Sequence, residues 1–251
     1  MKSKSTIIRI DAKKMYYREL NGKIHLAIDN GVKEIILDNV NGQRYIGDGL
    51  KSDIKIVING VPGNDLAAFM DGPTIIVNSN AQDGIGNTMN AGKIIVYGDG
   101  RDIVGHSMRG GKIYIRGNVG YRVGIHMKAY RDLYPVIVVG GTAGDFLGEY
   151  MAGGLIIILG LNRQESEPIV GNYIGTGMHG GRIYIRGEIE DYQLGKEIRL
   201  FSPEEEDRGE LNLYLKEYCQ YFSLDFQKIL KGRFVRLAPY THRPYGKLYA
   251  Y

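Results

Sequence analysis

Histidine is the side chain most often used for metal binding and for proton transfer near neutral pH. The chain has five: His25, His106, His126, His179 and His242. His106 and His126 fall in neighbouring units of a repeat and could face each other, but no third ligand is spaced to complete a zinc site. We therefore expect histidines in turns or on the surface, and no metal site in this chain.

The segment Gly175–Gly180 matches the pattern GxGxxG. A dinucleotide-binding site needs a strand before this pattern and a helix after it, whose N-terminus holds the pyrophosphate. Here a strand-like segment, Ile183–Ile185, follows within a repeat. We therefore expect these glycines to serve the backbone, and no cofactor site in this chain.

Three aspartates, Asp99, Asp102 and Asp145, lie in expected turns. Two carboxylates about 5–10 Å apart can act as acid and base on a glycosidic bond, and β-helical polysaccharide lyases and hydrolases place such groups along one wall. Aspartate is also favoured in turns for backbone reasons alone. Because that explanation suffices, we predict no catalytic residue, and a stand-alone β-helical carbohydrate-active enzyme stays an alternative.

The single cysteine, Cys219, lies among aromatic residues in a helix-like stretch, where we expect a buried and inert thiol. One cysteine excludes a disulfide within the chain, a four-cysteine iron–sulfur cluster and a CxxC redox pair. The 251 residues carry 32 Lys+Arg against 28 Asp+Glu, a balance that does not point to nucleic acid. No apolar run suits a membrane span or a signal peptide, so we expect a cytoplasmic protein with neither nucleic-acid nor membrane partners.

The elements that carry these residues are set by an internal repeat, built on 36 glycines, about twice the usual share. One apolar column recurs at spacings of 20, 19, 19, 19, 24 and 27: Leu50, Met70, Met89, Met108, Met127, Met151 and Met178. Five and seven residues later come apolar pairs such as Ile113/Ile115, which is strand periodicity with one face inward. Val136/Val138 joins these pairs if the first insertion precedes its strand.

Units of about 19 residues are too short for a strand plus a crossover helix, which needs about 30. Stacking them buries like residues upon like, which predicts an all-β fold: a single-stranded, right-handed parallel β-helix of about seven coils. We expect a cap and first coil over residues 1–45, the helix proper over 46–190, and a C-terminal helix and docking tail over 191–251. Apolar residues at a spacing of three to four predict the tail's helix between Leu211 and Leu230.

One column that should point outward is apolar: Val57, Ile76, Ile95, Tyr114, Ile137, Ile157 and Tyr184. Such a stripe requires cover, either from the chain's own helix or from a partner protein. The last residues are aromatic and basic and suit docking. The candidate partner-docking surface is therefore Ile95, Tyr114, Tyr184, Tyr240, His242, Arg243 and Tyr245.

The repeat G-x-x-M-x-G-G-x-I-x-I-x-G, clearest in 105–117 and 175–187, resembles the GXGXG β-helix domain of glutamate synthase. The final segment, 237–247, also resembles the separately encoded archaeal-type version, glutamate synthase domain 3. Related β-helices occur in one of the subunits of formylmethanofuran dehydrogenase and in N-methylglutamate synthase.

The resemblance implies a non-catalytic subunit of an oxidoreductase complex in glutamate biosynthesis and nitrogen metabolism. It would pack between a glutaminase and a synthase, help to shape an ammonia tunnel, and leave FMN and Fe-S clusters to those partner subunits. No family catalytic residue has a matching position here. A scaffold in a complex like formylmethanofuran dehydrogenase or N-methylglutamate synthase is an alternative, and self-association is left open.

Overall fold

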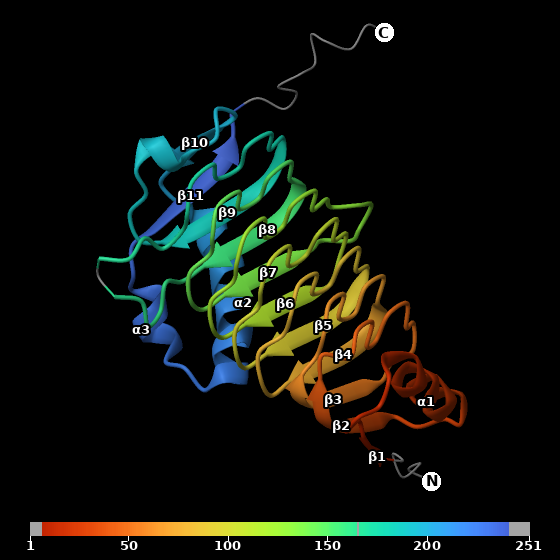
Figure 1. Ribbon diagram of the computed structural model, residues 1–251. Coiled ribbons are helices and arrows are strands. Elements are labelled where there is room, and N and C mark those ends of the chain that lie inside the picture. The colour runs from red at the N-terminus through yellow and green to blue at the C-terminus, as the bar shows by residue number, and fades with distance from the viewer. Residues whose placement is uncertain (1–6, 165, 241–251) are drawn as a thin grey trace, which may run out of the picture.

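Successive strands of the chain stack into one sheet. The computed structural model describes residues 7–164 and 166–240. Strands β1 to β9 follow one another in chain order, each parallel to the next, and β11 and β10 then close the far edge in antiparallel pairing. The result, shown in Figure 1, is the predicted parallel β-solenoid, with about six turns.

The bounds of the strands are β1 Ile7–Asp11, β2 Glu34–Asn41, β3 Lys55–Val61, β4 Asp71–Val77, β5 Ala91–Val96, β6 Lys112–Ile115, β7 Val136–Val139, β8 Ala152–Ile158, β9 Gly180–Arg186, β10 Ile198–Phe201 and β11 Phe234–Pro239. The helices are α1 Tyr17–Asp29, the short 3-10 helix η1 Asp191–Gln193, α2 Glu205–Phe222 and α3 Phe226–Leu230. No helix within the described residues combines the length and hydropathy needed to cross a membrane.

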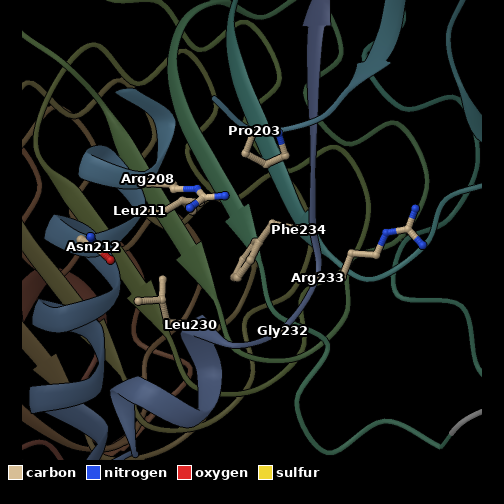
Figure 2. A pocket seen from close by; sticks show the side chains of 8 residues that line it. All are labelled: Pro203, Arg208, Leu211, Asn212, Leu230, Gly232, Arg233 and Phe234. Atoms are coloured by element: carbon tan, nitrogen blue, oxygen red, sulfur yellow. The ribbon is translucent and has the colours of Figure 1, made fainter. Parts of the chain in front are cut away.

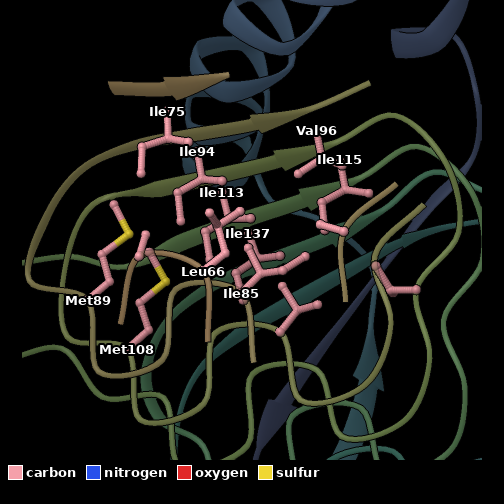
Figure 3. Close-up of a cluster of buried hydrophobic side chains, with 14 of the residues drawn as sticks. Leu66, Ile75, Ile85, Met89, Ile94, Val96, Met108, Ile113, Ile115 and Ile137 are labelled. Carbon is pink, nitrogen blue, oxygen red and sulfur yellow. The ribbon is translucent and has the colours of Figure 1, made fainter. Parts of the chain in front are cut away.

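The core is a set of ladders in which like residues lie upon like. One ladder runs through the seven strands β3 to β9 by direct pairing: Ile56, Ile75, Ile94, Ile113, Ile137, Ile156 and Ile183. Each of these side chains is fully buried, as are the methionines that face them across the interior (Figure 3). The apolar repeat of the sequence is therefore the inner wall of the solenoid.

One coil differs from the prediction. The repeat places Val136/Val138 inward, but Ile113 pairs with Ile137 and Ile115 with Val139, so Ile137 and Val139 enter the core. Val138, rather than Ile137, then takes its place in the outer column beside Tyr114. The four residues of β7 are all apolar and all buried, so alternation could not reveal which pair faces inward.

The wall opposite the sheet is built from glycine-rich turns. In each coil three alternate residues adopt positive φ, as in Gly84 (76°), Gly86 (67°) and Thr88 (54°). The middle position lies against the core: a Cβ on Gly47 would come within 2.5 Å of Ile75 Cδ1. The left-handed region and the close approach both favour glycine at the middle position, although Ala67 occupies it in one coil at a φ of 61°.

Both ends of the stack are covered. Helix α1 buries Leu20, Ile24 and Ala27 against the first coils. At the other end Ile198 of β10 and Leu237 of β11 join the same core. These caps keep the first and last coils from exposing their apolar interiors to water.

Candidate functional site

From Ile95 onward the apolar outer stripe is covered by the chain's own helix α2, which lies against the back of the sheet (Figure 1). Ile95, Tyr114 and Tyr184 are fully buried in a cluster with Leu215 and Tyr218 of α2. Three residues that we expected at a partner-docking surface are therefore covered by the chain's own helix. Sequence periodicity predicted a helix here, but the structure divides it into α2 and α3 at Ser223, which has positive φ (54°).

The rest of the candidate docking surface lies at the chain's end. Tyr240 is 54% exposed, and the Arg199 guanidinium lies 4.2 Å from its ring centroid. His242, Arg243 and Tyr245 lie outside the described residues.

A partly buried carboxylate, Glu217, fixes the C-terminal half of α2 to the sheet. Glu217 contacts Lys93 Nζ and Lys112 Nζ, each at 2.6 Å, and accepts a hydrogen bond from Tyr114 Oη at 2.8 Å. Burial alone would raise the pKa of Glu217, but the hydrogen bonds from Lys112, Lys93 and Tyr114 outweigh it and lower that pKa to about 2. Glu217 is therefore a structural anion at neutral pH.

A second carboxylate fixes the start of α2. Asp207 is buried, accepts a hydrogen bond from Tyr184 Oη, and pairs with Arg236 at 3.2 Å and Arg182 at 3.6 Å. Burial opposes ionisation of Asp207, yet these partners together with the Glu204 backbone N–H lower its pKa. Burial, followed by the bond to Asp207, raises the pKa of Tyr184, so the phenol stays protonated and donates.

The aspartates that suggested acid–base catalysis hold successive coils together. Asp99 Oδ1 accepts the backbone N–H of Asn118 (2.7 Å), Asp102 Oδ1 that of Tyr121 (2.9 Å), and Asp145 Oδ1 that of Asn172 (2.7 Å). Each bond joins one coil to the next. This arrangement accounts for the three carboxylates by backbone hydrogen bonding.

The histidine pair lies on the turn wall. The rings of His106 and His126 are 6.1 Å apart and steeply tilted, and His126 stacks on Tyr150 at 5.3 Å. Burial, followed by the nearby His126, lowers the pKa of His106, whose Nδ1 lies 3.2 Å from Asn87 Oδ1. Among residues 7–164 and 166–240, no three His, Cys, Asp or Glu side chains come together as a metal site would require.

The remaining motifs have structural surroundings. Gly175–Gly180 lies in a turn that leads directly into β9, with His179 Nδ1 3.1 Å from the Gly177 carbonyl oxygen. Cys219 is buried in α2, and burial raises the pKa of its thiol to about 11. A thiol with this pKa stays protonated at neutral pH and is a poor nucleophile.

A cavity of about 530 Å³ opens between α2, α3 and β11 (Figure 2). Leu211, Leu230 and Phe234 form its apolar lining, and Arg208 reaches over it. Arg233 at its margin pairs with Glu188 at 2.7 Å and points away. The cavity suits an apolar group and holds no nucleophile or acid–base pair.

Comparison with known proteins agrees with this architecture. The chain is 57% identical over 248 residues to "Uncharacterized protein MJ1350" of Methanocaldococcus jannaschii, a match that covers 96% of this chain and 95% of the relative. It also resembles a chain in the crystal structure of the formyltransferase/hydrolase complex of Methylorubrum extorquens, solved with methylofuran. That similarity has a TM-score of 0.66 at 17% identity and covers 93% of this chain and 94% of the other.

The sequence pattern leads to the same architecture by a separate route. The family model described as "GXGXG motif" matches residues 6–240, which include every coil of the solenoid. The chain therefore belongs to the GXGXG motif family.

Proposed function

We propose that this chain is a non-catalytic scaffold subunit that holds catalytic subunits in a multi-subunit complex. The observation that carries the proposal is the near end-to-end fold similarity to one chain of the formyltransferase/hydrolase complex. The chemistry of the described residues supports it, because the three candidate aspartates accept hydrogen bonds from backbone N–H groups and the cysteine is buried. A stack of coils with a regular strand spacing has a defined length and suits the role of a spacer.

Within this role we favour a complex of the formylmethanofuran-related type, because the similar solved chain comes from a formyltransferase/hydrolase complex. Its partners would then be subunits that carry formyl-transfer or hydrolysis chemistry. The second candidate is a glutamate synthase-like complex, with glutaminase and FMN/Fe-S synthase subunits as partners. It is favoured by the sequence likeness of 105–117, 175–187 and the final segment to that domain.

Partner identification in native cells tests the proposal. The full chain, carrying a cleavable tag, is crosslinked in the source cells, purified and analysed by mass spectrometry. Recovery of formyltransferase or formylmethanofuran dehydrogenase subunits in fixed ratio supports the first candidate, and recovery of glutaminase and synthase subunits supports the second. A chain that runs as a free monomer and hydrolyses glutamine or a polysaccharide unaided would overturn the scaffold role.

A matched pair of variants links assembly to the tail. Tyr240→Ala removes an exposed aromatic side chain of the predicted docking tail, whereas Tyr121→Ala removes one that is 55% exposed in the turns between β6 and β7. If the tail docks, the first variant loses partners during size-exclusion chromatography and the second retains them. Equal retention by both variants would remove Tyr240 from the docking surface.

A further inference from the structure

The first coils contain a feature that the rest of the solenoid lacks within the described residues. Strands β1 and β2 are parallel and are joined through α1, which makes a strand–helix–strand unit. In open α/β sheets, ligands bind outside the carboxyl ends of the strands. A cavity of about 810 Å³ lies there, lined by the loop after β1, the end of β2, and Asn59 and Gly60 of β3.

The cavity is electropositive. Lys13 and Lys14 line it, and within the described residues neither ammonium forms a hydrogen bond or an ion pair. The neighbouring carboxylate, Asp11, is already engaged by Asn39 Nδ2 at 2.8 Å and by the Lys13 backbone N–H at 3.0 Å. The cavity lining itself contains no acidic residue. Lys13 also attracts the neighbouring Asp11 carboxylate, but the lining carries two lysines and no acid, and this net positive charge favours an anion.

An aromatic platform adjoins the lysines. Tyr16 lines the cavity, is 60% exposed, and has its ring centroid 4.5 Å from that of Tyr17. The ring centroids of Tyr17 and Tyr45 are in turn 5.6 Å apart, and the Arg44 guanidinium lies 5.1 Å from the Tyr17 ring centroid. Packing of this kind holds the Tyr16 ring in place as a surface on which a planar group can stack.

We propose that this cavity binds a phosphorylated small molecule with a planar ring, the chemistry of a nucleotide. Its phosphates would lie at Lys13 and Lys14, and its ring against Tyr16. This role is independent of the scaffold function, because the cavity lies at the end of the stack opposite β10 and β11.

Calorimetric titration of the full chain with ADP, adenosine and inorganic phosphate tests the site. ADP is expected to bind about tenfold more tightly than either part alone, and more weakly as the KCl concentration rises. Tyr16→Ala should weaken ADP binding about tenfold and leave phosphate binding unchanged. The Lys13→Ala/Lys14→Ala variant should weaken both.

A charge-matched control separates a built site from general attraction. Lys228→Ala/Lys231→Ala removes two exposed lysines from the α3 region and should leave ADP binding unchanged. Because Lys13, Lys14 and Tyr16 are exposed, all variants should melt at the wild-type temperature. The proposal is overturned if ADP does not bind, if ADP binds no better than phosphate, or if the control pair weakens binding as much as Lys13→Ala/Lys14→Ala does.

Discussion

A single aspartate shows how one side chain orders two coils. Asp99 Oδ1 accepts the Asn118 N–H at 2.7 Å, and the same oxygen occupies the space that a Cβ on Gly117 would fill. The carboxylate and the glycine therefore act as a pair: one satisfies a backbone donor and the other leaves room for it. Asp102 and Gly120 repeat this pairing, as do Asp145 and Gly171.

This pairing predicts a thermodynamic coupling between Asp99 and Gly117. Asp99→Ala should lower the free energy of unfolding by about 1–2 kcal/mol, because the Asn118 N–H loses its partner. Gly117→Ala should lower it by about 1–3 kcal/mol, because the new Cβ meets the carboxylate. The double variant should lose less free energy of unfolding than the two single variants lose together, because removing the carboxylate makes room for the methyl group. Urea denaturation measures all three, and strict additivity would contradict the pairing.

At the scale of elements, α2 closes the outer face of the sheet. The face of α2 that packs against the sheet includes Leu215, which is fully buried. The face toward solvent includes Leu213, which is 60% exposed. Glu217 and Asp207 add charged contacts from the same helix to lysines and arginines. The helix therefore belongs to the folded unit, and a partner that binds the chain meets the outside of α2 rather than the stripe beneath it.

Two leucines on opposite faces of α2 test this assignment. Leu215→Ala should lower the free energy of unfolding by about 2–4 kcal/mol, because it leaves a cavity against the outer column. Leu213→Ala on the same helix should change it by less than about 0.5 kcal/mol. Equal effects in chemical denaturation would show that α2 does not pack as described.

The low pKa of Glu217 predicts an acid-sensitive attachment of α2. Its folded-state pKa of about 2 lies below the usual 4.5, so its contribution to stability is present above pH 4.5 and is lost as the pH falls toward 2. Glu217→Gln should melt at a lower temperature at pH 7 and should lose less further stability between pH 5 and pH 2. Glu188→Gln, which breaks an exposed ion pair, serves as the control and should follow the wild type. Parallel curves for Glu217→Gln and wild type would contradict the prediction.

The sequence predicts the solenoid well because its inner columns repeat a single environment. It fails at β7, where four buried residues show no alternation, since the insertion before the strand hides the phase of the repeat. It does not determine what covers the outer stripe, because cover by the chain's own helix and cover by a partner protein both require the same apolar column in the sheet. It does not single out Lys13, Lys14 and Tyr16 of the proposed site, whose signal is a basic–aromatic run at the start of a strand–helix–strand unit.

At the scale of the whole molecule, the stack is modular in its length. Each coil contacts mainly its neighbours, so its stability is a sum of local terms. The coil between Ile56 and Ile75 lies outside the fully buried part of the outer column, which begins at Ile95. Removing it shortens the stack by one strand spacing, about 4.8 Å, without disturbing α2.

Two deletions that differ by one residue test this modularity. Deleting residues 57–75 joins Ile56 to Ile76, which takes the outward position of Val57, its direct partner in the native pairing. This variant should keep a native-like circular dichroism spectrum and a cooperative melt. Deleting residues 57–76 instead forces the buried Val77 outward and should abolish the cooperative melt, because a slip of one residue exchanges the two faces of a strand. Equal behaviour of the two deletions would contradict the ladder. If the shorter stack folds but no longer assembles with the partners of the wild-type chain, assembly of the complex depends on the length of the stack.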